Sequence, residues 1–193
     1  MTDRSAHPLP ADELAVLGER VFCDDELGLE WTALEETPDE ATVAQMNARN
    51  ATVLRTLALV EEHDETQSED AERAELHRLE AKLDLTLELL SDLISMKRGR
   101  VPRRAVRFNS RGLCWRADDA PPAGTLLLVD CFVLPAWPIP LKLLARVHGA
   151  EAADDGHKVC TRLEQLDPGV RDWLEKLVFR RHRRAIARRR ATA

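Results

Sequence analysis

The stretch RFNSRGLCW at residues 107–115 decides the fold. Apolar residues flank a polar centre in which Asn109 accepts unusual backbone angles and Gly112 supplies positive φ, so the pattern predicts two short strands joined by a tight turn. Two more apolar runs follow, GTLLLV at 124–129 and PLKLLARV at 140–147. Because turn residues precede both runs, they predict further buried strands.

These landmarks, in this order, resemble the core of a PilZ domain, the small barrel that reads cyclic di-GMP in bacteria. The resemblance covers residues 103–190 and implies an α+β fold, in which a small antiparallel PilZ-like β-barrel carries a C-terminal helix. The alternation of apolar and acidic residues at Phe22–Leu34 predicts an extra barrel strand. Asp167 and Pro168 predict the cap and the first residue of the last helix.

The family motif (Asp/Asn)-x-Ser-x-x-Gly is degenerate in this chain. When the motif is aligned on Gly112, Asn109 stands at the serine position and Arg107 at the acidic or amide position. In the family an Arg-x-x-x-Arg element also wraps the ligand, since guanidinium groups chelate phosphate and stack on bases. The residues that the resemblance implies as a cyclic di-GMP site are Arg103, Arg104, Arg107, Asn109, Ser110 and Gly112.

A second interpretation of the same residues needs no ligand. Arginine pairs such as Arg103 and Arg107 have the family spacing, but they directly adjoin the turn, and an arginine-rich stretch produces this spacing by chance. The arginines would then form a charged helix end and the strand after it, stabilised by the helix dipole and by the acidic N-terminal half. Asn109 and Gly112 would serve only the turn.

Heptad spacing before the barrel predicts long N-terminal helices that associate between chains. The start of the first helix is predicted from three residues. Thr37 would be its cap, Pro38 its first residue, and Glu40 the closing side chain of a capping box. A second helix is predicted to end near residues 96–99. Asn50 at an a position would fix register and strand number. The predicted oligomerisation residues are Val43, Met46, Asn50, Val53, Leu57, Leu76, Leu79, Leu83 and Leu90.

The segment between these helices has two interpretations. Residues 61–75 are polar and mostly acidic, so they form either a solvated continuation of the first helix or a connector. The apolar surface at residues 83–94 is wider than a two-helix seam requires. It implies packing onto the barrel, a four-helix arrangement, or both.

The helical region resembles that of an atypical PilZ subgroup, in which a long heptad-bearing helix drives tetramer formation. We therefore expect an N-terminal segment at 1–36 with a possible extra barrel strand, a coiled-coil oligomerisation region at 37–98, and the barrel with its C-terminal helix at 99–193. The resemblance implies a homo-oligomer, a tetramer, with partners among signalling, pilus or motility proteins. It also implies an effect on virulence.

The sequence is compatible with three functions. The first is a non-enzymatic regulatory adaptor of cyclic di-GMP signalling, and the second is a true receptor that binds the dinucleotide through Arg103, Arg104, Arg107 and Asn109. The third is a nucleic-acid-binding protein that uses the basic cluster at 180–190, although the net charge of −6 and the acidic remainder of the chain disfavour it. Calorimetry with cyclic di-GMP separates the first two.

Composition excludes several other classes. The N-terminus lacks a signal-peptide pattern and the longest apolar run is too short to span a membrane, so we expect a cytoplasmic protein without membrane insertion. The four cysteines lie far apart, which predicts buried, reduced thiols. The histidines are scattered and the sequence has no glycine-rich phosphate loop, so we expect a protein that is not an enzyme and holds no resident metal or cofactor, with cyclic di-GMP as a possible ligand.

Overall fold

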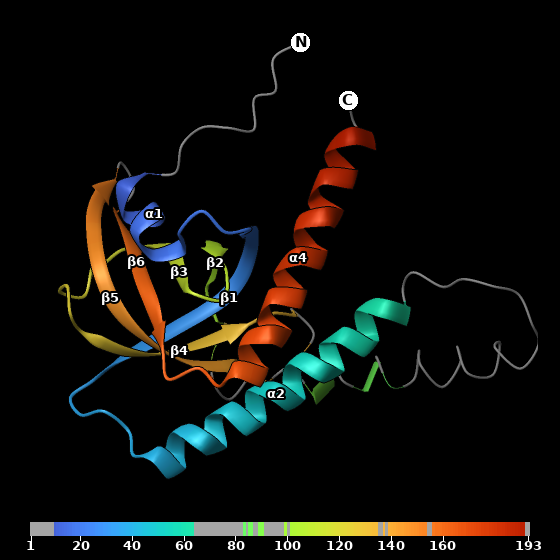
Figure 1. Ribbon diagram of the computed structural model, residues 1–193, viewed down its shortest axis with the longest axis horizontal. Helices are drawn as coiled ribbons and strands as arrows, with labels where there is room; N and C mark the ends of the chain where they lie inside the picture. Colours follow the sequence, from blue (N-terminus) through green and yellow to red (C-terminus); the bar gives the residue numbers. More distant parts are fainter. Residues whose placement is uncertain are drawn as a thin grey trace, which may run out of the picture.

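The computed structural model describes residues 10–63, 83, 85–86, 89–90, 99, 101–134, 137, 139–153 and 156–191. Within them, six antiparallel strands close into a barrel in the order β1-β2-β3-β6-β5-β4 (Figure 1). The strands are β1 (Cys23–Leu34), β2 (Arg103–Phe108), β3 (Gly112–Ala117), β4 (Leu126–Phe132), β5 (Leu141–Ala153) and β6 (Gly156–Glu164). The predicted small antiparallel barrel is confirmed.

The strand predicted at Phe22–Leu34 closes this barrel. β1 is 12 residues long and pairs with β2 through its first half and with β4 through its second half. Leu27 and Leu29 from β1 join the buried core together with Trp115 from β3 and Val129 from β4. A strand from the N-terminal segment is therefore integral to the barrel, because it covers two strand edges that would otherwise be unpaired.

Among the described residues, three helices pack on this barrel. They are α1 (Ala11–Leu17), α2 (Glu40–His63) and α4 (Pro168–Ala191). In Figure 1, α2 and α4 cross at one end of the barrel, whereas α1 lies beside β3 and β6. Asp167 caps α4 as predicted, because its carboxylate accepts a hydrogen bond from the Gly169 amide at 2.8 Å.

The start of α2 differs from its prediction. Asp39, rather than Thr37, caps this helix: its carboxylate accepts a hydrogen bond from the Thr42 amide at 2.7 Å. Hydrogen bonding with Thr42 lowers the pKa of Asp39. The helix consequently begins at Glu40, so the proposed capping box with Thr37 and Glu40 does not form.

The predicted seam residues on α2 pack inside their own chain. Val53 and Leu57 belong to the core cluster, and Asn50 is 1% exposed. The Asn50 amide donates to the Lys142 carbonyl at 2.7 Å, and its oxygen accepts from the Lys142 N–H at 2.9 Å. Asn50 therefore extends the β5 ladder as a peptide group would, which corrects its assignment to a seam between chains. Val43 and Met46 remain half-buried.

The second predicted helix lies mostly outside the described residues. Residues 83, 85, 86, 89 and 90 are helical, but Leu76 and Leu79 fall outside the described part of the chain. Within the described residues α2 is thus the long N-terminal helix, and the predicted pair of long heptad-bearing helices is not shown.

Removal of the Asn50 amide tests its role as a clamp between α2 and the barrel. Asn50→Ala is expected to lower the free energy of unfolding by about 2–3 kcal/mol, because two backbone groups of Lys142 lose their partners in a buried position. Urea unfolding followed by circular dichroism measures this change. Thr52→Ala is the matched control on an exposed turn of α2, with an expected change below about 0.5 kcal/mol; equal effects of the two substitutions would contradict the clamp.

Candidate ligand-binding face

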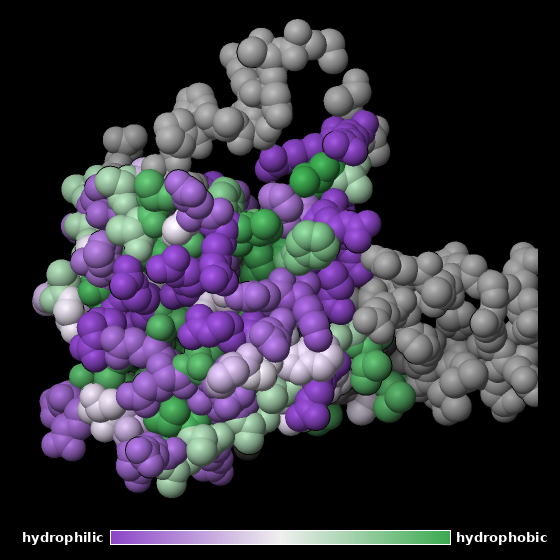
Figure 2. All heavy atoms as spheres, in the orientation of Figure 1, coloured by the Kyte–Doolittle hydropathy of each residue, from purple (hydrophilic) through white to green (hydrophobic). Residues whose placement is uncertain are grey.

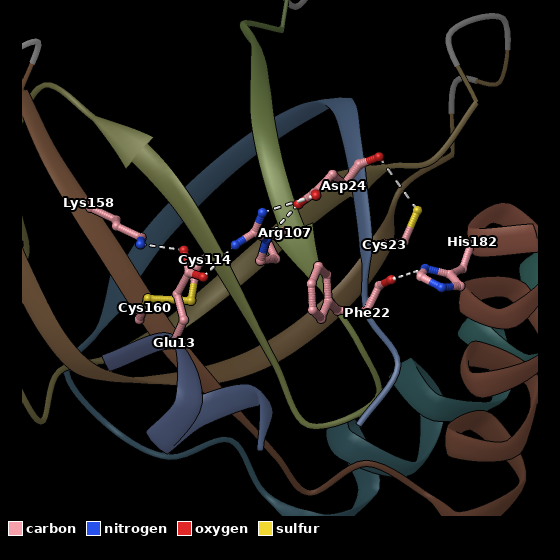
Figure 3. Close-up of polar contacts among 9 residues, drawn as sticks. All are labelled: Glu13, Phe22, Cys23, Asp24, Arg107, Cys114, Lys158, Cys160 and His182. Carbon is pink, nitrogen blue, oxygen red and sulfur yellow. Dashed lines mark hydrogen bonds and ion pairs between the residues drawn. A yellow bond between two sulfur atoms is a disulfide. The ribbon is translucent and has the colours of Figure 1, made fainter. Parts of the chain in front are cut away.

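One row of neighbouring residues crosses the outer face of the barrel. Backbone pairing places Asp24 beside Arg107, Arg107 beside Cys114, and Cys114 beside Cys160. Successive residues of a strand point to opposite faces, and the alternate residues Val106 and Phe108 fill the core. The row therefore faces outward, where α1 covers part of it (Figure 3).

Arg107 is the centre of an ion-pair network on this face. Its Nε donates to Asp24 Oδ1 at 2.6 Å and its Nη2 to Asp24 Oδ2 at 3.0 Å. Its Nη1 donates to Glu13 Oε2 at 2.6 Å, and Glu13 also pairs with Lys158 (Figure 3). The Phe22 ring lies 4.7 Å from the guanidinium carbon. The arginine predicted to hold a ligand is thus held by two carboxylates of its own chain.

The charge of Arg107 is strongly favoured in this setting. Hydrogen bonding to Asp24 raises the pKa of Arg107 most, partial burial lowers it, and hydrogen bonding to Glu13 raises it further. The Glu13 side chain is only 5% exposed, whereas that of Arg107 is 30% exposed. A carboxylate so deeply buried requires cationic partners, and Arg107 and Lys158 supply them.

Asn109 and Ser110 form the turn next to this network. The buried Asn109 side chain donates to the Leu17 carbonyl at 2.9 Å and accepts from the Arg111 amide at 2.8 Å. The Ser110 hydroxyl donates to Glu175 at 2.7 Å, and Arg171 donates to the Ser110 carbonyl at 2.8 Å. These polar groups therefore bind the end of α1 and the side of α4.

Gly112 has a different role from the one its turn predicts. It is the first residue of β3, and it is not among the described glycines with positive φ. A β-carbon at this position would overlap the Thr161 carbonyl oxygen and the Val16 side chain. Gly112 is thus required for the close approach of β6 and α1, which corrects the prediction of positive φ.

Arg103 and Arg104 do not converge with Arg107. Arg103 donates to the Glu26 carbonyl at 2.8 Å. Arg104 lies on the opposite side of the strand from Arg107, donates to the Arg116 carbonyl at 3.0 Å, and stacks 5.0 Å from the Trp31 ring centre. The six candidate residues therefore lie on β2, on the turn after it and at the start of β3, without forming one ligand cradle.

A small pocket opens beside the turn. Its volume is about 240 Å³, and Asn109 and Ser110 line it together with Arg20, Val21, Glu175, Val178 and Phe179. Small-molecule sites usually measure roughly 300–1,000 Å³. The space available next to the turn is consequently below the usual range for such a site.

The basic end of α4 also makes contacts within the chain. Arg181 pairs with Asp25 and donates to the Val133 carbonyl at 3.0 Å. His182 lies 3.1 Å from the Phe22 carbonyl (Figure 3). On the side of the molecule drawn in Figure 2, polar residues cover much of the surface, and hydrophobic residues are exposed there in separate patches. Part of the predicted basic cluster thus fastens α4 to β1.

Several residues of this face were not predicted as site residues. Glu13, Asp24 and Lys158 carried no recognised motif, although Asp12 and Glu13 before Gly18 are typical of a short helix with acidic residues in its first turn. The structure also joins Cys114 and Cys160 in a disulfide, so the prediction of four reduced thiols is wrong for this pair. Cys23 and Cys131 are buried, as predicted.

Comparison with known proteins now identifies the class. The family model of the atypical PilZ domain, described as a cyclic di-GMP receptor, matches residues 54–191, and the chain belongs to this family. Among the described residues, no helix is long and apolar enough to cross a membrane.

A solved structure from Xanthomonas campestris resembles this chain along most of its length. It is described as a pathogenic protein with a new tetrameric PilZ domain, self-assembled via an unusual helical bundle. The two chains are 29% identical with a TM-score of 0.72, and the match covers 92% of this chain and 97% of that one. No curated protein matches the chain.

A substitution at Gly112 tests the close approach of β6 and α1 to this residue. Gly112→Ala is expected to lower the free energy of unfolding by about 3 kcal/mol, because the new methyl group meets the backbone of β6 as well as Val16. Gly169→Ala is the comparison: its β-carbon would meet only a side-chain oxygen, that of Asp167 at 3.1 Å, while alanine favours the helix, so the net change is expected to stay within about 1 kcal/mol. Urea unfolding measures the free energy of unfolding of both variants. A decrease below about 1 kcal/mol for Gly112→Ala would contradict the close approach of β6 and α1 to this residue.

Proposed function

We propose that this chain is a non-enzymatic regulatory adaptor in bacterial cyclic di-GMP signalling, which assembles with itself and acts through protein contacts. The observation that carries the proposal is the occupation of Arg107 by Glu13 and Asp24. Asn109 and Ser110 are likewise engaged with Leu17 and Glu175. Three of the residues that would contact a dinucleotide thus hold α1 and α4 against the barrel instead.

The ion pairs would compete with a ligand. A phosphate that bound Arg107 would have to displace Glu13, which would leave a buried carboxylate with fewer partners. Breaking a buried ion pair costs about 3–5 kcal/mol, and the partial exposure of Arg107 reduces this to about 2–3 kcal/mol. Such a cost weakens binding about 30- to 150-fold. This supports an adaptor over a receptor.

Self-assembly is supported by exposed leucines in the predicted second helix. A monomer seldom exposes large apolar side chains so close together, because their burial against a partner is favourable. Leu83 and Leu90 are one heptad apart, as in the predicted seam. The exposed fractions are 62% for Leu83, 56% for Leu85, 57% for Leu89 and 47% for Leu90. We propose residues 37–98 as the assembly region, and a tetramer by analogy with the Xanthomonas protein.

A true receptor is the second candidate, and the description of the family as a cyclic di-GMP receptor favours it. In that case Arg103, Arg104, Arg107 and Asn109 would contact the ligand. The function would require release of Glu13 from Arg107, because this carboxylate occupies the guanidinium.

Titration calorimetry distinguishes adaptor from receptor. Cyclic di-GMP is expected to give no saturable heat with the full chain up to high micromolar concentrations, since Arg107 is already paired. A saturable heat that is lost in Arg107→Ala, while the variant keeps its circular dichroism spectrum, would overturn the adaptor proposal. Arg116→Ala is the control for the loss of an arginine from an exposed position on β3.

Light scattering after size-exclusion chromatography tests the assembly. The chain of 21.8 kDa is expected to elute as a tetramer at micromolar concentration. Leu83→Glu combined with Leu90→Glu should dissociate it, because both substitutions place charge in the contact. Val21→Glu changes an exposed apolar residue outside the helices and should leave the mass unchanged. A monomeric native chain would contradict self-assembly.

A further inference from the structure

The disulfide lies on the outer face of the barrel directly under α1. Cys114 on β3 and Cys160 on β6 are paired residues whose Cα atoms are 4.2 Å apart, as expected where two antiparallel strands approach closely. Both cysteines are buried, at 2% and 1% exposure. They form one apolar cluster with Val16 and Leu17 of α1, and Phe22 packs against it. Any reagent that reaches these sulfur atoms must therefore pass α1.

Two cations flank this cysteine pair. Arg107 is the direct neighbour of Cys114 across the β2-β3 pairing, and Lys158 lies two residues before Cys160 on the same face of β6. Neighbouring cations favour the thiolate, which is the reactive form of cysteine. Glu13 binds both cations while α1 is in place (Figure 3). The same helix thus shields the sulfur atoms and neutralises the charges beside them.

The other two cysteines provide an internal comparison. Cys131 is buried in the barrel core, where burial raises the pKa of its thiol to about 12. Cys23 also belongs to the core cluster, and its thiol contacts the Asp24 carbonyl at 3.7 Å. Neither lies under α1 between Arg107 and Lys158. Differences in reactivity between the two sets of cysteines consequently report on the α1 environment.

We propose that Cys114 and Cys160 form a reversible thiol–disulfide site gated by α1. A thiolate of an external dithiol attacks one sulfur atom, so that the Cys114–Cys160 bond breaks and a mixed disulfide forms. The second thiol of the reagent then releases the remaining protein thiolate. The protein gains two electrons and two protons, and the dithiol becomes a cyclic disulfide. Glutathione disulfide reverses the reaction and leaves as two glutathione thiols.

Reduction has a structural consequence for α1. Two thiols cannot remain at bonding distance, because non-bonded heavy atoms need roughly 3.5 Å or more. The pair is enclosed by the sheet on one side and by Val16 and Leu17 on the other, and α1 has seven residues. The extra space therefore comes from displacement of α1, which carries Glu13 away from Arg107 and Lys158. Lasting disulfides are rare in reducing compartments, and a pair that closes there typically responds to redox conditions.

Alkylation of the full chain under native conditions, followed by peptide mass spectrometry, tests the site. With dithiothreitol, Cys114 and Cys160 should react with iodoacetamide while Cys23 and Cys131 stay unlabelled, and glutathione disulfide should restore protection. Glu13→Gln should raise the rate of reduction about tenfold, whereas the exposed control Glu19→Gln should not change it. Unreactive Cys114 and Cys160, or failure to re-form their disulfide, would overturn the proposal.

Hydrogen exchange tests whether the redox state of Cys114 and Cys160 is coupled to α1, and it needs no substitution of Glu13 or its partners. The amides of Ala11–Leu17 should exchange about fivefold faster or more in the reduced chain, and return to the slower rate after reoxidation. In Cys114→Ala combined with Cys160→Ala, exchange in α1 should no longer depend on dithiothreitol. Equal α1 exchange in the oxidised and reduced native chain would contradict the gate. This outcome is independent of cyclic di-GMP binding and of self-assembly.

Discussion

The ion pairs of Arg107 join parts of the molecule that are distant in sequence. The guanidinium holds Asp24 on β1 and Glu13 on α1, and Glu13 in turn holds Lys158 on β6. A helix as short as α1 is not stable alone, so its position depends on contacts with the barrel. The buried carboxylate makes this position specific, because only a cationic site can accept it. The turn at Asn109 and the cysteine pair are covered as a result.

The same constraint connects the fold with the proposed function. In a receptor, arginine on this face would be available to phosphate; here it completes the packing of the N-terminal segment. The segment gives the barrel both its closing strand β1 and its cover α1. In the assembly that we propose, the exposed Leu83, Leu85, Leu89 and Leu90 would provide the contact surface. Under these proposals, the outer face of the barrel would serve the regulation of α1, and the helical region would make the contacts with other chains.

Local patterns predicted most of the barrel but little of the site. Apolar runs and turn residues are sufficient for strands such as β4 and for the Asp167 cap, because these depend on neighbours in the sequence. Asn50 was misplaced since core-facing and seam-facing positions on a helix have nearly the same spacing. Glu13 and Arg107 are 94 residues apart, and Cys114 and Cys160 are 46 apart. Such pairs depend on strand register and on the packing of distant segments, which local sequence patterns do not reveal.

A double-mutant cycle between Glu13 and Arg107 tests this account most directly. Free energies of unfolding in urea are measured for the native chain, Glu13→Gln, Arg107→Met and the double variant. Because the carboxylate is buried and shares its hydrogen bonds with the guanidinium, the two residues should show a coupling energy of about 1–2 kcal/mol. A coupling energy within about 0.3 kcal/mol of zero would mean that α1 is held by other contacts, and would contradict the account.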